Sequence, residues 1–153
     1  MPALLEAPVR MLLHTDGSMT SLLEAAFDAP VEVELVANLV DHRLPTPWEL
    51  ELEPGRPALW RQVVLHVGGR PALRAGSVLA LDRFDVGACA RLLDGNEPIG
   101  RIVSSLETRR ELLSIVEDDG DYERTSRIIS GARPLAVVTE RIPASIFDPC
   151  CVH

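Results

Sequence analysis

The sequence predicts an α+β domain: one antiparallel β-sheet of about six strands, with helices packed around it. Stretches in which apolar and polar residues alternate, the pattern of half-buried strands, recur along the chain and are joined mostly by short turns. Helical spacing of apolar residues is confined to a few short stretches in the front and middle of the chain. A length of 153 residues fits one domain with its own core, so we expect a single domain over residues 1–153.

The first half predicts one helix, one strand and a proline-rich loop. Capping residues before an apolar helical stripe predict a helix from Met19 to Phe27, which Pro30 ends. Residues 31–40 alternate as a strand does, and residues 41–57 hold four prolines and form a loop. Strict alternation places one set of apolar side chains on a single face of this strand: Val31, Val33, Leu35, Ala37 and Leu39.

The rest of the chain predicts hairpins around a helical insert. Residues 58–67 and 70–81 flank Gly68-Gly69, which tolerates the positive φ angles of a tight hairpin turn. A helix is expected at residues 85–93, and a second, short one begins at Pro98. Further strands are expected at residues 108–117, 122–130 and 133–145.

Two charged side chains stand on apolar strand faces. Glu140 shares a face with Ala136, Val138 and Ile142, and a buried carboxylate needs a cationic partner or a proton. Arg61 is the one cation on the apolar face of residues 59–67. The pair either holds and protonates an anionic ligand or forms a structural ion pair, and Arg61 alone could also reach solvent at the strand end.

Composition narrows the function classes. A net charge of -8 argues against binding DNA or an anionic membrane through a broad basic surface, so we expect no nucleic-acid partner. No run of eighteen apolar residues and no secretory signal is found, and three cysteines form no paired framework. We therefore expect no membrane span and a cytoplasmic location. The histidines show no metal-ligand spacing; Cys150, Cys151 and His153 could hold a soft metal, but a frayed tail is the favoured interpretation.

An ordered set of short motifs resembles the chorismate pyruvate-lyase family, whose members make 4-hydroxybenzoate from chorismate. Each motif alone is weak, but they follow the family's order across almost the whole chain. They are Asp16-Gly-Ser-Met-Thr20, Trp60-Arg61, Gly69-Arg-Pro71, Pro98-Ile-Gly-Arg101, Ser126-Arg127, Gly131-Ala-Arg-Pro-Leu135 and Thr139-Glu-Arg-Ile-Pro-Ala-Ser145.

The resemblance implies roles for individual residues. Arg61 matches the arginine that binds the ring carboxylate, and Glu140 matches the glutamate on the ring-hydroxyl side, although its motif is one residue shorter here. Backbone amides at Met19 and at Ile99-Gly100 match two ligand-covering flaps. The longer enzymes have an arginine where this chain has Gly76. The candidates for binding the side-chain carboxylate are Arg74, two residues earlier, Arg101 and Arg127.

The function that the resemblance implies is removal of pyruvate from chorismate, with no metal or cofactor because aromatisation drives the reaction. The expected partners are a small-molecule substrate and its aromatic product, and the expected state is a monomer. The alternative is a non-catalytic domain that binds a small aromatic acid, like the sensor domains of bacterial transcription regulators.

Overall fold

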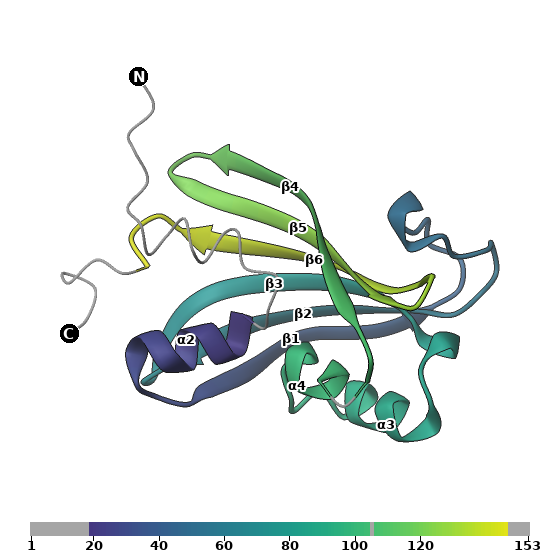
Figure 1. The fold of residues 1–153 in the computed structure, drawn as a ribbon, viewed down its shortest axis with the longest axis horizontal. Helices are drawn as coiled ribbons and strands as arrows, with labels where there is room; N and C mark the ends of the chain where they lie inside the picture. The colour runs from purple at the N-terminus through teal and green to yellow at the C-terminus, as the bar shows by residue number, and fades with distance from the viewer. Residues whose placement is uncertain (1–18, 105, 147–153) are drawn as a thin grey trace.

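The computed structural model describes residues 19–104 and 106–146, and it has the expected architecture of one antiparallel sheet with helices. The six strands lie in the order β1-β2-β3-β6-β5-β4 (Figure 1). Their bounds are β1 Val31–Asp41, β2 Ala58–Val67, β3 Arg70–Ala80, β4 Arg109–Asp118, β5 Asp121–Ser130 and β6 Arg133–Pro143. The helices are α2 Met19–Phe27, α3 Val86–Asp94 and α4 Ile99–Val103, with short 3-10 turns η1 Trp48–Leu50 and η2 Leu81–Arg83.

Local sequence explains where these elements begin and end. Gly68 and Gly69 both have positive φ, as the turn between β2 and β3 requires. The Asp85 side chain caps α3 by accepting a hydrogen bond from the Ala88 amide at 2.8 Å, and Gly95 ends this helix in the left-handed conformation. The helix and hairpin boundaries predicted from sequence are therefore confirmed to within a few residues.

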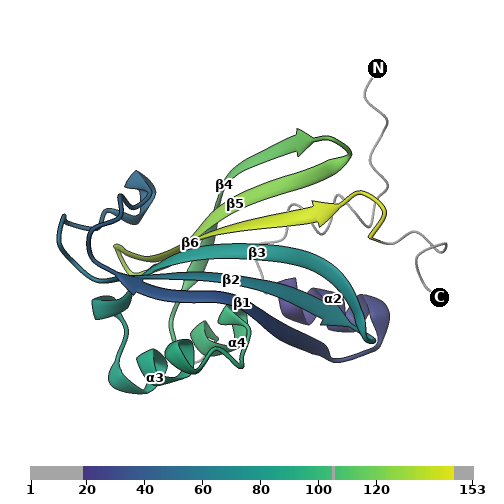
Figure 2. The same ribbon diagram turned by 180° about the vertical axis from the view of Figure 1, so that it is seen from behind.

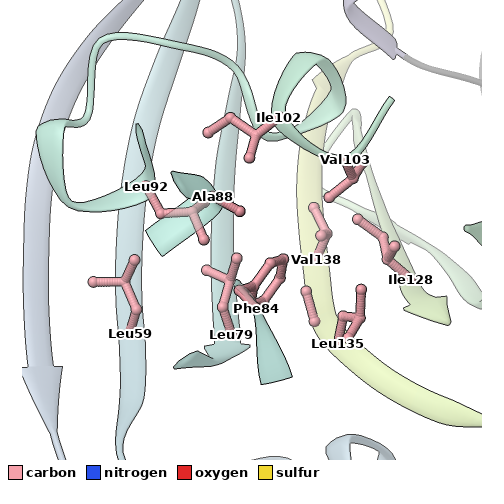
Figure 3. Close-up of a cluster of buried hydrophobic side chains, with 11 residues drawn as sticks. Leu59, Leu79, Phe84, Ala88, Leu92, Ile102, Val103, Ile128, Leu135 and Val138 are labelled. Atoms are coloured by element: carbon pink, nitrogen blue, oxygen red, sulfur yellow. The ribbon is translucent and has the colours of Figure 1, made fainter. Parts of the chain in front are cut away.

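The three α-helices of the described residues lie on one side of the curved sheet, which we call the front face (Figures 1 and 2). At one end, α2 packs on β2 and β3 in a cluster that includes Leu23, Leu65 and Leu73. At the other end, α3 and α4 pack on the strands in a second cluster, where Leu59 and Leu79 face the helices (Figure 3). The opposite, back face is covered in part by the loop that carries η1.

Between these two clusters the front face is polar. Strand pairing aligns Arg61, Ser77, Val138 and Ser126 in one row, and the next row places Glu140 beside Arg124. Side chains in such rows share a face of the sheet. The fold therefore holds a band of buried polar groups between two apolar regions that carry the helices.

One predicted strand face is wrong. In β1 the pairing shifts between Leu35 and Ala37: Leu35 pairs with Val63, whereas Ala37 pairs with Gln62. A bulge of one residue moves all following side chains to the other face. Val31, Val33 and Leu35 thus face the front, while Ala37 and Leu39 face the back.

Candidate functional site

A small cavity lies over the polar band of the front face. Its floor comes from β2, β3 and β6, with Arg110 of β4 at its side, and its roof comes from the first residues of α2 and α4. The described lining residues are Met19, Thr20, Arg61, Val63, Leu65, Ala75, Ser77, Pro98, Ile99, Gly100, Arg110, Val138 and Glu140. The structure thus brings five of the predicted site residues together: Met19, Arg61, Ile99, Gly100 and Glu140.

Arg61 is buried in this cavity with unused donors. Its side chain projects from the middle of β2, and the residue is 1% exposed. One nitrogen, Nη2, donates to the backbone carbonyl of Glu97, but Nε and Nη1 have no hydrogen-bond partner among the described residues. Burial lowers the pKa of Arg61, and the nearby Glu97 carboxylate opposes this shift. An arginine keeps its charge under such conditions, so Arg61 presents a desolvated cation to the cavity.

Glu140 lies between two other arginines. Its Oε1 is 3.1 Å from Nε of Arg124 and 3.6 Å from Nη1 of Arg110. The first is an ion pair by distance, but Oε1 and Nε are not aligned for a hydrogen bond. Arg124 is fully buried and Glu140 is 3% exposed, so this ion pair lies out of contact with bulk water.

The predicted partnership between Arg61 and Glu140 is therefore not a direct ion pair. Arg61 stands in the Ser77 row on β2, whereas Glu140 stands in the next row on β6, with β3 between these strands. The two groups line the same cavity from different sides, each with its own protein contacts. The two side chains therefore face the same space without neutralising each other directly.

The roof consists of the first turns of α2 and α4, which a side-chain ion pair connects. Nη2 of Arg101 on α4 is 2.7 Å from Oε2 of Glu24 on α2, and the same carboxylate oxygen accepts a hydrogen bond from the Val31 amide. Both contacts lower the pKa of Glu24, and the hydrogen bond from the Val31 amide has the larger effect. The cavity beneath has a volume of about 40 Å³. Pockets that hold small molecules usually measure about 300–1,000 Å³, so the roof must move before a ring can enter.

Three predicted site residues lie outside the cavity. Arg101 is part of the roof contact just described. Arg127 extends from the back face of β5, where it contacts Glu111 and Glu51. Arg74 pairs across the sheet with Val64 and Arg141 and lies in an open hollow on the back face.

Arg74 and Arg127 lie outside the cavity for a common reason: each projects from the back face of its strand. In the β2–β3 hairpin Arg61 pairs with Ser77, so Ser77 is on the front face of β3. Alternation along the strand then puts positions 76 and 74, occupied by Gly76 and Arg74, on the back face. In β5, alternation puts Arg124 with Ser126 and Ile128 and puts Arg127 on the opposite face.

Two site arginines were missed by sequence reasoning. Arg124 could have been found, because it shares the apolar face of its strand with Ile128. Arg110 had a weaker indication: it precedes a pairing shift between Leu112 and Ser114, which breaks the alternation of β4.

Other expectations concern absences or residues outside the described ranges. In the described part of the chain no helix is long and apolar enough to cross a membrane. Among the same residues, no group of three or more His, Cys, Asp or Glu side chains is arranged to hold a metal ion. The predicted caps Asp16 to Ser18, and Cys150, Cys151 and His153, lie outside these residues.

Solved structures with this fold include bacterial regulators. PhnF from Mycobacterium smegmatis superposes with a TM-score of 0.63 at 14% identity, over 85% of this chain and 65% of that chain. The separate effector domain of PhnF gives the same TM-score over 83% of this chain and 88% of that one. The ligand-binding domain of a putative GntR-family transcriptional regulator from Bordetella bronchiseptica gives 0.54 at 16% identity, over 73% and 85% of the two chains. At such identities the likeness concerns the fold alone.

Sequence comparison points to one enzyme family. The chorismate pyruvate-lyase of Mycobacterium tuberculosis is 29% identical over 168 residues, which cover 94% of this chain and 83% of that protein. The chorismate pyruvate-lyase of Escherichia coli O1:K1 is 29% identical over 135 residues, covering 87% and 81% of the two chains. The model of the family described as "Chorismate pyruvate-lyase Rv2949c-like" matches residues 13–121, well over half of the sequence. The chain therefore belongs to the Rv2949c-like chorismate pyruvate-lyase family.

Proposed function

We propose that this protein is a lyase that removes pyruvate from chorismate and leaves 4-hydroxybenzoate. Family membership supports the reaction class. The observation that carries the proposal is the cavity itself, where a buried arginine with unused donors and a buried glutamate face the same space from different strands. A ring acid with a carboxylate at one end and a proton to lose at the other would meet both groups once the roof opens.

The proposed reaction balances without any further reactant. The carbon–oxygen bond between the ring and the enolpyruvyl arm breaks, and the ring carbon that carries the hydroxyl group loses its proton. The electrons of that carbon–hydrogen bond complete the aromatic ring. The departing enolpyruvate takes up a proton at its methylene carbon and becomes pyruvate, so nothing is oxidised or reduced overall.

In this proposal Arg61 binds the ring carboxylate. A guanidinium donates to a carboxylate through charge-assisted hydrogen bonds, which are strong where water is excluded. Because Nε and Nη1 of Arg61 have no partner among the described residues, binding would satisfy donors that burial leaves without one. Backbone amides at Met19 and Ile99-Gly100, which line the cavity, would cover the ligand from the roof.

Glu140 is the proposed acid–base group. Its carboxylate would take the ring proton or relay it to the departing arm, as a positioned glutamate can. Arg124 is fully buried, and its Nε lies only 3.1 Å from Oε1 of Glu140, so it holds the carboxylate in place. Arg124 would thus act through Glu140 as a positioning residue.

Incubation of the purified protein with chorismate tests the proposal. We expect equimolar pyruvate and 4-hydroxybenzoate, measured by a coupled lactate dehydrogenase assay and by chromatography, at a rate above that of chorismate alone. Tight binding of chorismate without release of pyruvate would overturn the lyase proposal and favour the non-catalytic binding domain. The absence of both binding and turnover would overturn both.

Breaking the roof contact should accelerate ligand exchange. In Arg101→Ala the ion pair between α4 and α2 is lost, and since exposed pairs contribute up to about 1 kcal/mol, we expect 4-hydroxybenzoate to dissociate about two- to fivefold faster. Stopped-flow fluorescence would measure this rate. Arg56→Ala is the matched control, because it removes an exposed ion pair to Asp82 at 2.8 Å, outside the cavity lining. Equal dissociation rates in both variants would contradict a closing role for the Arg101–Glu24 pair.

A further inference from the structure

The cavity carries more positive charge than its own carboxylate can balance. Among the described lining residues, Arg61 and Arg110 are the cations and Glu140 is the one carboxylate. Arg124, which lies behind the lining, already pairs with Glu140. Arg110 and Arg124 therefore share the one carboxylate of the described lining residues, and Arg61 has no carboxylate partner among them.

Within residues 19–104 and 106–146, the rim of the cavity supplies no second carboxylate. Glu97 is the nearest alternative, but its side chain is half exposed and forms two hydrogen bonds with Arg91, at 2.9 and 2.5 Å. These bonds lower the pKa of Glu97 and direct its carboxylate to Arg91. An uncompensated buried charge is costly. The positive charges of the arginines that Glu140 does not balance therefore favour a ligand with two negative groups.

Of the two arginines that line the cavity, Arg110 has the longer polar contacts. Its Nη1 lies 3.5 Å from Oγ of Ser126 and 3.6 Å from Oε1 of Glu140, well beyond the 2.7–2.9 Å of a strong charge-assisted hydrogen bond. Burial lowers the pKa of Arg110, Glu140 opposes the shift and Arg124 adds to it. The guanidinium stays charged but makes only long polar contacts within the described residues.

The two cations also approach the cavity from different directions. Arg61 comes from β2 and Arg110 from β4, and β3, β6 and β5 lie between these strands. Both still line the one cavity because the sheet is curved and arginine side chains are long (Figure 1). Two carboxylates on different parts of one small molecule can therefore each meet a separate guanidinium.

We propose that Arg110 binds the second carboxylate of a dianionic ligand and so determines the preference of this site for dianions over monoanions. The assignment rests on the proposed function, in which that carboxylate belongs to the enolpyruvyl arm of chorismate. The product 4-hydroxybenzoate has only the ring carboxylate, so it makes no contact with Arg110.

The test uses two unreactive ring acids that differ in one charge. 3-(Carboxymethoxy)benzoate has two carboxylates and 3-methoxybenzoate has one, and isothermal titration would give both dissociation constants. In Arg110→Met the dianion should bind about 10- to 100-fold more weakly, the effect of losing one hydrogen-bonded charge contact, while the monoanion changes less than about threefold. With chorismate, KM should rise more than kcat falls.

Two further variants complete the experiment. Arg109→Met is the matched control, since this neighbouring side chain is exposed and contacts the Gly131 carbonyl instead of the cavity; both acids should bind it as they bind the wild type. Arg110→Lys keeps the charge and should retain part of the dianion preference if the methionine variant folds poorly. An equal loss for both acids, or no loss for either, overturns the assignment. Because neither acid reacts, the dianion preference is measured even if chorismate is not cleaved.

Discussion

Replacing Glu140 with glutamine is expected to lower kcat for pyruvate release from chorismate by about 10²- to 10⁴-fold, the contribution of a positioned acid–base group. Glutamine has the same shape, and its amide oxygen still accepts a hydrogen bond, but an amide cannot take a ring proton at neutral pH. Binding of 4-hydroxybenzoate should change little because Arg61 is intact. Steady-state kinetics with chorismate and titration with 4-hydroxybenzoate separate the two effects.

The fold must survive this substitution for the result to be informative. Loss of the carboxylate leaves Arg124 and Arg110 without their shared anion, so thermal unfolding of the variant should be measured and activity assayed well below its Tm. Glu111→Gln is the control, because Glu111 pairs with Arg127 outside the cavity. If Glu140→Gln kept kcat within tenfold of the wild type, Glu140 would have no part in proton transfer.

Periodicity in the sequence was sufficient to predict most of this fold. Local features determine it: the alternation in β2, β3, β5 and β6, the Gly68-Gly69 turn, and the caps of α3. The side of β1 was mispredicted beyond Leu35, because a bulge depends on pairing with β2 and leaves no mark in the apolar pattern.

The sequence of a single strand was enough to predict which of its charged residues are buried. It was not enough to predict which residues of different strands meet. A charge on an apolar face identified Glu140 and Arg61, and both are buried. Which side chains meet in space depends on the strand order β2-β3-β6-β5-β4, which places Arg124 beside Glu140 and separates Arg61 from it. Neighbours across strands are a property of the sheet, so the partners of Glu140 could not be read from the sequence of β6 alone.

Arg61→Met should abolish binding and stabilise the fold at the same time. Without the guanidinium, 4-hydroxybenzoate loses its charge-assisted contact, and we expect at least about 100-fold weaker binding. The same change removes a buried cation of which Nε and Nη1 have no partner among the described residues, and methionine fills much of the same volume. We therefore expect the free energy of unfolding to rise by about 1–3 kcal/mol, since each unsatisfied buried donor costs energy in the free protein.

Arg83→Met is the comparison that makes this prediction specific to Arg61. Arg83 donates to three backbone carbonyls, those of Leu50, Glu51 and Pro134, at 2.6 to 2.8 Å. Its loss should lower stability and leave ligand binding unchanged, because those carbonyls lose their donor and Arg83 does not line the cavity. Urea unfolding of both variants gives the sign of each change in the free energy of unfolding. Opposite signs mean that Arg61 is retained for binding at a cost in stability, whereas destabilisation by Arg61→Met would make Arg61 a structural residue that holds Glu97 and the start of α4 in place.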